Sequence, residues 1–239
     1  LEMHNIPGGL CTAYERKGYK WDLSMHMLTG SCSGPFHHMW QELGVVQNRK
    51  FHYHKEMARI ENKEGKNLTY TTDRKELEDQ MLKLSPGDAS LIREFIDLIF
   101  GKDLMNAASL KPQELSNFFD SVKTWPVILP LIGKFIKYGN KTIQDFAGQF
   151  QDPFLRQAVR LYIDAPGWPM LNFPMVALAG FMKSAVSEAG VPLGGSQQVV
   201  YGIADMYRKL GGEFEFKCIV KDLIIEDNRA VGVRLTDGS

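Results

Sequence analysis

The sequence predicts an α/β protein, with α+β character within these 239 residues, in which a mainly helical segment is inserted into a glycine-bearing unit. Short β-like segments with glycine pairs occupy both ends of the chain. Apolar residues at helical spacing fill most of the middle. The chain is 44% hydrophobic and 23% charged, as is usual for a globular protein. We expect a partial domain over 1–50, an inserted domain over 51–190 and the rest of the first domain over 191–239.

The charge and cysteine content narrow the class of protein. The formal net charge is zero and the basic residues are dispersed, which argues against a nucleic-acid partner. The cysteines, Cys11, Cys32 and Cys218, are far apart and form no Cys-x-x-Cys motif. They indicate a reducing, cytoplasmic location and no structural zinc site.

The first dozen residues carry the most informative motif. A dinucleotide-binding unit places an acidic residue after its second strand, about 20 residues beyond the glycine-rich turn, where it binds the ribose. Glu2 is suited to that position, and Pro7-Gly8-Gly9 follows it. Glycine lets the backbone approach a pyrophosphate closely, although such a dipeptide is also common in ordinary turns. Because no Gly-x-Gly-x-x-Gly turn precedes Glu2, we expect an internal piece of a larger protein.

The following residues predict short elements. Cys11 and Thr12 form a polar turn that can donate further hydrogen bonds. The segment from Gly18 through Leu28 predicts a short strand that turns a tight corner. Within residues 1–50, helical character is predicted only over Pro35–Leu43.

The middle of the chain predicts a β-hairpin and then helices. The hairpin comprises 51–60 and 67–71, joined by a polar turn at 62–66. Asp73 is a helix N-cap, and Ser85 is the cap of the next helix, with Pro86 in its first turn. Further helices are predicted over 112–123, 126–138, 142–150, 153–163 and 173–189.

The last 50 residues return to strands and glycines. Val191-Pro192-Leu193-Gly194-Gly195-Ser196 leads into a helix whose apolar stripe ends at Leu210, with Ser196 as its N-cap and Gly211-Gly212 as its stop. Three β-like segments follow, over 213–216, 219–226 and 230–235, the last two joined by Asp227-Asn228.

These two terminal blocks together resemble the flavin-dependent phytoene desaturases and their retinol-saturase-like and amine-oxidase-like relatives. The first block is Glu-x-x-x-x-Pro-Gly-Gly followed by Gly-Tyr-x-Trp-Asp, and the second is Pro192-x-Gly194-Gly195-Ser196 with Val231-Gly232-Val233-x-Leu235-x-Asp237-Gly238. The resemblance covers about the first and last fifty residues in order and spacing, and the middle only in kind. It implies an incomplete Rossmann-like FAD-binding domain with an inserted, mainly helical substrate domain.

The resemblance also implies roles for individual residues. Glu2 would bind the adenosine ribose, Gly8 and Gly9 would lie by the pyrophosphate, and the backbone of Val220 would face the adenine. The loop at Met25-His26 would pass near the flavin ring, which makes His26 the candidate for a residue at the reaction centre. The cofactor-binding set that we predict is Glu2, Pro7, Gly8, Gly9, Cys11, Thr12, Met25, His26 and Val220.

The sequence departs from the family pattern at two positions. Leu10 stands where many members carry an arginine directed at the phosphates, and Met25-His26 replaces a Gly-Pro loop. A histidine at this point is similar to the retinol-saturase-like branch.

The function implied is hydride transfer between FAD and a hydrophobic, isoprenoid or polyene-like substrate. One alternative is a non-catalytic helical module that binds lipid or a protein partner, and another is a flavin amine oxidase-like enzyme. Without the glycine-rich turn, we expect residues 1–239 alone to bind FAD weakly and to be inactive.

Two apolar stretches, 125–136 and 170–182, are too short to span a bilayer and contain proline. They indicate buried core helices or, alternatively, a substrate tunnel wall or a peripheral membrane contact.

Other constellations predict no further chemistry. His37-His38 and His52-x-His54 have no acidic residue or cysteine at ligand spacing, so we predict no metal site. Ser196 lacks the Gly-x-Ser-x-Gly elbow of a nucleophile.

Overall fold

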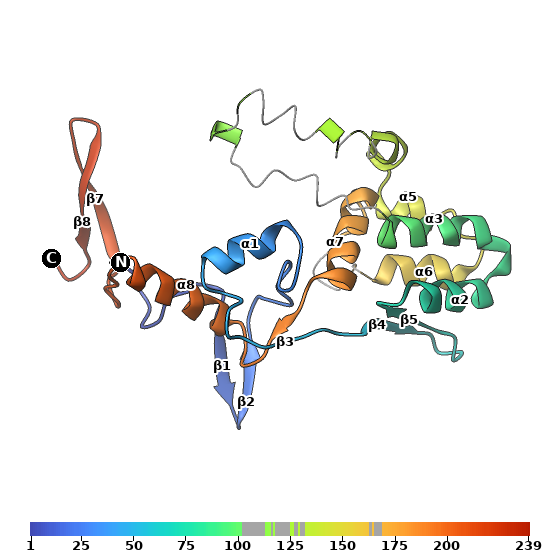
Figure 1. Cartoon of the computed structure of the whole chain (residues 1–239), viewed down its shortest axis with the longest axis horizontal. Helices are drawn as coiled ribbons and strands as arrows, with labels where there is room; N and C mark the ends of the chain where they lie inside the picture. Colours follow the sequence, from blue (N-terminus) through green and yellow to red (C-terminus); the bar gives the residue numbers. More distant parts are fainter. Residues whose placement is uncertain are drawn as a thin grey trace. The chain divides into compact units, whose positions relative to one another are not determined.

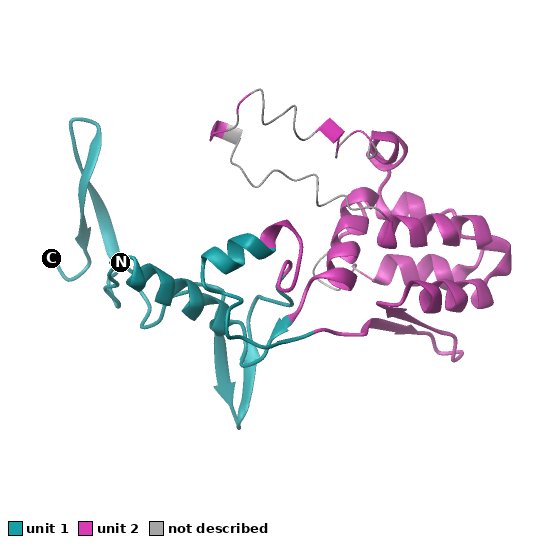
Figure 2. Cartoon of the chain, viewed as in Figure 1, with its two compact units in different colours: residues 1–28, 37–52, 191–239 teal, residues 29–36, 53–190 magenta. Residues whose placement is uncertain are grey.

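A computed structural model describes residues 1–101, 113–115, 117, 125–126, 129, 132–162, 164 and 169–239 (Figure 1). The chain forms two compact units (Figure 2). Unit 1 comprises Leu1–Leu28, His37–His52 and Val191–Ser239, and unit 2 comprises Thr29–Phe36 and Tyr53–Gly190. The predicted helix over 112–123 lies almost wholly outside the described residues, and that over 126–138 lies partly outside them.

Unit 1 combines short antiparallel strand pairs with one long helix. Its elements are β1 (Ala13–Arg16), β2 (Tyr19–Asp22), β3 (Phe51–His52), β6 (Val191–Pro192), α8 (Gln197–Lys209), β7 (Val220–Glu226) and β8 (Arg229–Leu235). The first two residues of helix α1 (Pro35–Glu42) belong to unit 2, and the rest of the helix belongs to unit 1. The strands pair as β1–β2, β3–β6 and β7–β8.

The β1–β2 hairpin differs from the sequence prediction, which contained a single short strand. Lys17 (φ 52°) and Gly18 (φ 78°) form its turn, with both residues in the left-handed region. Such a turn matches the right-handed twist of the flanking strands. The sequence signal was weak because lysine rarely occupies the first position of this turn.

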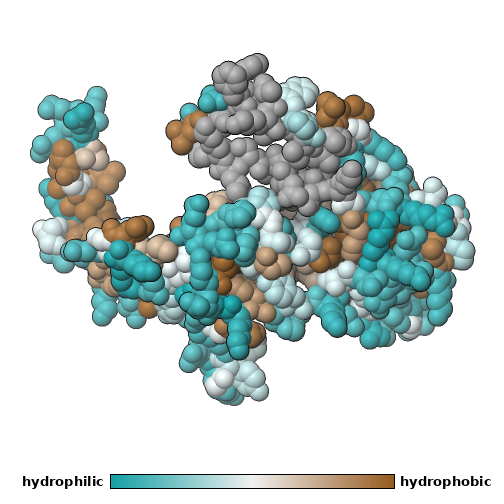
Figure 3. Space-filling model, in the orientation of Figure 1, coloured by the Kyte–Doolittle hydropathy of each residue, from teal (hydrophilic) through white to brown (hydrophobic). Residues whose placement is uncertain are grey.

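A small hydrophobic cluster supports α8 in unit 1. Leu28, Val45 and Val199 are buried in it, and the partly buried Trp40 and Phe51 pack around them. Gly202 of α8 is required for this packing. A Cβ there would lie 2.7 Å from the Gly44 carbonyl oxygen. The β7–β8 hairpin, by contrast, carries exposed hydrophobic surface, as Figure 3 shows.

Unit 2 is a helical body with one β-hairpin. Its elements are β4 (Glu56–Glu61), β5 (Asn67–Thr71), α2 (Arg74–Leu84), the 3₁₀ turns η1 (Pro86–Asp88) and η3 (Gln113–Leu115), α3 (Ala89–Phe100), α5 (Ile143–Ala147), α6 (Pro153–Leu161) and α7 (Met175–Ser187). β4 and β5 pair in antiparallel fashion, so the predicted hairpin forms. Its first strand begins at Glu56, however, because the predicted residues Phe51–His52 pair with Val191–Pro192 instead.

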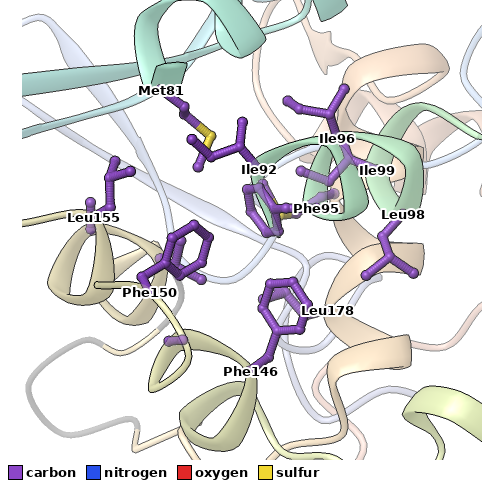
Figure 4. Packing of buried hydrophobic residues seen from close by; sticks show 14 of the residues in the cluster. Met81, Ile92, Phe95, Ile96, Leu98, Ile99, Phe146, Phe150, Leu155 and Leu178 are labelled. Atoms are coloured by element: carbon purple, nitrogen blue, oxygen red, sulfur yellow. The ribbon is translucent and has the colours of Figure 1, made fainter. Parts of the chain in front are cut away.

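The main core of the molecule lies in unit 2 (Figure 4). Phe146 of α5 is fully buried at its centre, with ring centroids of Phe95, Tyr138 and Phe150 at 5.9, 6.3 and 6.1 Å. The apolar stretch 170–182 contributes to this core through α7, in which Leu178 is fully buried. Among the described residues, no helix has the length and hydrophobicity of a membrane span.

Of the two helix caps predicted in unit 2, the structure has the one at Asp73 and differs at Ser85. The Asp73 carboxylate accepts a hydrogen bond from the Glu76 amide at 2.9 Å, as expected at the start of α2. Ser85 differs from the prediction, because it makes no side-chain cap and its hydroxyl donates to Asp88 at 2.8 Å. Asp88 in turn accepts the amides of Gln151 and Asp152 at 2.9 and 3.1 Å. A buried carboxylate therefore holds two distant segments together.

The Asp88→Asn substitution is expected to lower the free energy of unfolding of unit 2 by about 1–3 kcal/mol, because an amide cannot accept all these donors. Burial raises the pKa of Asp88, but the hydrogen bonds from Gln151, Asp152 and Ser85 outweigh it and leave the pKa lowered. The stabilisation is therefore complete above the ordinary aspartate pKa and is lost as the pH falls through the lowered value. Urea unfolding of the parent and the Asp88→Asn variant, from neutral to acid pH, measures this difference in stability. Equal stabilities at neutral pH would contradict it.

A candidate nucleotide-binding site in unit 1

The first residues of the chain pair in parallel with the segment that follows α8. The Glu2 amide donates to the Glu215 carbonyl at 2.8 Å, and the Cys218 amide donates to the Glu2 carbonyl at 3.0 Å. A parallel bridge joins Glu2 to Phe216. Parallel neighbours require a crossover connection, and α8 immediately precedes this segment. Residues more than 200 positions apart in the sequence thus lie side by side.

A cavity of about 580 Å³ opens beside this parallel contact. Four of the predicted cofactor residues, Glu2, Pro7, Gly8 and Cys11, contribute to its lining. The other lining residues are mostly apolar: Leu1, Trp40, Val199, Val200, Ile203, Ala204, Tyr207, Glu213 and Phe214. The cavity therefore joins a carboxylate and a glycine turn to an apolar wall formed largely by α8.

The Glu2 carboxylate is held in place by its own turn. Its Oε1 accepts a hydrogen bond from the His4 amide at 2.8 Å. A carboxylate has about four lone-pair directions, so the group can still accept hydrogen bonds from a diol.

The two glycines of the turn play different roles. Gly8 (φ 123°) packs tightly, since a Cβ there would lie 2.9 Å from both the Cys11 carbonyl oxygen and a Val200 methyl group. A Cβ on Gly9 (φ 54°) would meet nothing within 4 Å. Gly8 thus seats the turn on α8, and Gly9 leaves its backbone accessible beside the cavity.

Replacing Gly8 by alanine is expected to destabilise unit 1 by about 1–3 kcal/mol, because steric overlap adds to backbone strain. The matched change Gly9→Ala should cost about 1 kcal/mol, since only the left-handed backbone opposes it. Thermal unfolding of the two variants and the parent measures the difference. Equal losses would show that the packing of Gly8 against Val200 is unimportant.

Cys11 and Thr12 hold the turn against the loop before α8. The Cys11 thiol donates to the Ser196 carbonyl at 3.8 Å. Burial, with a smaller contribution from the nearby Asp22 carboxylate, raises the pKa of Cys11, in keeping with a thiol that donates. The Thr12 hydroxyl accepts from the Gln197 side chain at 3.2 Å. These contacts give both side chains a structural role next to the cavity.

Asp22 is a residue that the sequence analysis missed. Its Oδ1 accepts the Ser196 amide at 2.8 Å and the Ser196 hydroxyl at 2.7 Å. Ser196 stands at the N-cap position of α8, as predicted, but its side chain makes no cap bond, because its hydroxyl donates to Asp22 of β2. No local motif could reveal this, because the two residues are 174 positions apart.

The Asp22→Ala substitution is expected to cost about 1–3 kcal/mol, because the amide and hydroxyl of the buried Ser196 lose their acceptor. It should also accelerate trypsin cleavage at Lys17 and Lys20 in the β1–β2 hairpin. Asp205→Ala is the control, because that exposed carboxylate pairs with Arg208 of its own helix at 3.5 Å. Unchanged cleavage in the Asp22 variant would contradict the anchoring role.

The remaining predicted residues lie outside the cavity lining. Met25 packs against the cluster around Leu28 and Val45, so its side chain has a core role. His26 is exposed. Val220 is 43% exposed and follows Cys218, whose amide is bonded to Glu2, by two residues.

The arrangement fits the nucleotide half of a dinucleotide. In dinucleotide-binding α/β proteins a carboxylate binds the ribose and a glycine turn lies by the phosphates, and here Glu2, at an isolated parallel bridge, lies beside the Gly8 turn. Within the described residues, no group of three or more His, Cys, Asp or Glu could hold a metal ion. Unit 1 thus brings a carboxylate, a glycine turn and an apolar wall to one cavity.

The comparison with known families defines the class further. The family model of flavin containing amine oxidoreductases matches residues 1–239, and the chain belongs to this family. It is 26% identical over 250 residues to a lycopene-forming phytoene desaturase of Pseudescherichia vulneris, covering all of this chain and 47% of that protein. It is 23% identical over 251 residues to an all-trans-retinol 13,14-reductase of Danio rerio (all of this chain, 40% of that protein). It is 25% identical over 263 residues to a chloroplastic prolycopene isomerase of Daucus carota, covering all of this chain and 40% of that protein.

These relatives confirm the family resemblance identified from the two terminal blocks. The chain spans about half the length of the curated relatives it matches. Membership of this family supports the assignment of the chain to a flavin oxidoreductase.

Proposed function

We propose that the protein containing these residues is an FAD-dependent oxidoreductase that moves hydride between the flavin and a hydrophobic, isoprenoid or polyene-like substrate. The observation that carries this proposal is the shared cavity, in which Glu2 and Gly8 lie together beside α8 in a chain of the flavin family. The substrate class is supported by the relatives, which are a lycopene-forming phytoene desaturase and an all-trans-retinol 13,14-reductase.

In this proposal the chain's own residues bind the cofactor. Glu2 accepts hydrogen bonds from the adenosine ribose, and the backbone at Gly8 and Gly9 lies by the pyrophosphate. Cys11 and Thr12 keep that turn against the loop before α8. A bound flavin supplies the two-electron redox chemistry. The Val220 backbone lies toward the adenine, and His26 toward the substrate.

The two units have different roles in this proposal. Unit 1 binds FAD, and unit 2 provides the substrate domain. The free cysteines Cys11, Cys32 and Cys218 support a cytoplasmic location for the enzyme. Contact with a membrane surface, where an apolar substrate is dissolved, belongs to the same proposal.

The test uses the purified protein that contains these residues. We expect a flavin absorbance spectrum, and anaerobic addition of a micellar polyene should change the flavin redox state, in the direction that the enzyme catalyses. Both oxidised and chemically reduced protein are mixed with the polyene, because the direction is not assumed. Benzylamine is the comparison substrate. A response to benzylamine alone would identify an amine oxidase-like enzyme, and a protein without flavin would identify a binding module.

A further inference from the structure

A second cavity of unit 1, of about 750 Å³, lies on a different face of α8 from the first. Its lining residues on α8 repeat at helical spacing: Gln198, Gly202, Asp205 and Lys209. Residues at this spacing lie on one face of a helix. Val200, Ile203 and Tyr207 line the first cavity from the other face of α8. The two cavities are therefore separate, and the proposed function does not use the second.

Arg49 lines the second cavity from the loop after α1, and only one end of its guanidinium group has partners. Nη1 donates to the Gly44 carbonyl at 2.7 Å and to the Val45 carbonyl at 3.4 Å. Nε is buried and has no hydrogen-bond partner among the described residues. Within that part of the chain, every hydrogen bond of the Arg49 side chain runs from Nη1. Because a buried donor without an acceptor is costly, an acceptor for the Nε–Nη2 edge is expected.

The charges of the cavity favour an anion. Lys209, the last residue of α8, has no acidic partner among the residues that the structure describes. The Asp205 carboxylate pairs with Arg208 of its own helix at 3.5 Å, so its charge is partly neutralised. Arg49 and Lys209 therefore give the cavity a positive charge that Asp205 offsets only in part.

The two cations are of the kinds that bind phosphate. The Nε–Nη2 edge of an arginine can donate to two oxygens of one phosphate, and a lysine binds phosphate as a point charge. A phosphate monoester carries about two negative charges at neutral pH, which matches two cations better than a single carboxylate does. The volume of the cavity also lies within the range of sites for small molecules.

We propose that the second cavity binds the phosphate group of a small phosphorylated metabolite between Arg49 and Lys209. The phosphate accepts hydrogen bonds from Nη2 and, once the side chain rotates to expose it, from the buried Nε of Arg49. This site is distinct from the flavin site, which the proposed function places at the first cavity. Its test requires no flavin.

Isothermal titration calorimetry with inorganic pyrophosphate, at low ionic strength, tests the proposal on the purified protein that contains these residues. Lys209→Gln should weaken binding by about two- to fivefold, as for the loss of one exposed ion pair, and Asp205→Ala should strengthen it by a similar factor. Arg49→Lys should weaken it by about tenfold or more, because lysine lacks the two-donor edge. The matched control is Lys221→Gln, which removes the same charge from the exposed strand β7, outside the cavity lining.

Opposite effects of the Lys209 and Asp205 variants are the result expected from a phosphate in this cavity. The absence of binding, or binding that neither variant changes, would overturn the proposal. Displacement of pyrophosphate by FAD would also overturn it, because the probe would then occupy the first cavity. An equal affinity for malonate, a dicarboxylate of similar charge, would overturn the choice of phosphate over carboxylate.

The Arg49 variant needs a check of folding, because this side chain also holds the Gly44 carbonyl. Circular dichroism and thermal unfolding of each variant provide that check. The Lys209 and Asp205 variants leave the contact of Arg49 with Gly44 intact, so the test stands without the Arg49 variant.

Discussion

Replacing Phe146 by alanine is expected to lower the free energy of unfolding of unit 2 by about 3–5 kcal/mol, enough to unfold a marginally stable domain. The side chain is fully buried and touches three other aromatic rings, those of Phe95, Tyr138 and Phe150. Truncation therefore removes transfer energy, leaves a cavity and breaks the ring contacts together. Urea unfolding monitored by circular dichroism measures the loss.

Phe135→Ala is the matched control for this change. It removes the same atoms from a side chain that is 49% exposed in the neighbouring helix, so we expect a change within about 0.5 kcal/mol. Similar losses in both variants would mean that Phe146 is not at the centre of the core. A small loss at Phe146 alone would lead to the same conclusion.

Local sequence signals predicted several helix ends in both units. The N-cap at Asp73 satisfies the α2 amide as its spacing indicates. The predicted helix over 142–150 corresponds to α5, which a Thr142–Asp145 capping box begins. The Gly211-Gly212 stop is also correct, with Gly211 at φ 89° and the Gly212 amide bonded to the Tyr207 carbonyl. These signals lie within a few residues of the groups that they satisfy.

Contacts between distant residues could not be predicted in the same way. The bond of Asp22 to Ser196 and the pairing of Glu2 with Phe216 join the two ends of the chain. The exposed Ile132, Phe135 and Ile136 have the same helical spacing as the buried Ile92, Phe95 and Ile96 of α3. Periodicity therefore predicts a hydrophobic face without saying what covers it. Of the nine residues predicted to bind the cofactor, four line the cavity, Glu2, Pro7, Gly8 and Cys11. The other five, Gly9, Thr12, Met25, His26 and Val220, are not among its lining residues.

The second large effect is expected at Glu2. A carboxylate that accepts hydrogen bonds from a ribose diol contributes about 1.5–3 kcal/mol for each bond to the charged group. Glu2→Ala should therefore weaken FAD binding by about 10–100-fold, with Glu2→Gln in between because the amide still accepts one bond. The exposed Glu15 of β1 provides the control, since Glu15→Ala removes the same group away from the cavity.

The dissociation constant of FAD for the flavin-free protein tests most directly whether the two ends of the chain together hold the adenosine half of the flavin. Quenching of FAD fluorescence measures it in the parent and in the Glu2 and Glu15 variants, with thermal unfolding to verify that each is folded. The account predicts weaker binding in the order parent, Glu2→Gln, Glu2→Ala, with Glu15→Ala equal to the parent. Equal dissociation constants in the parent and a folded Glu2→Ala variant would contradict it.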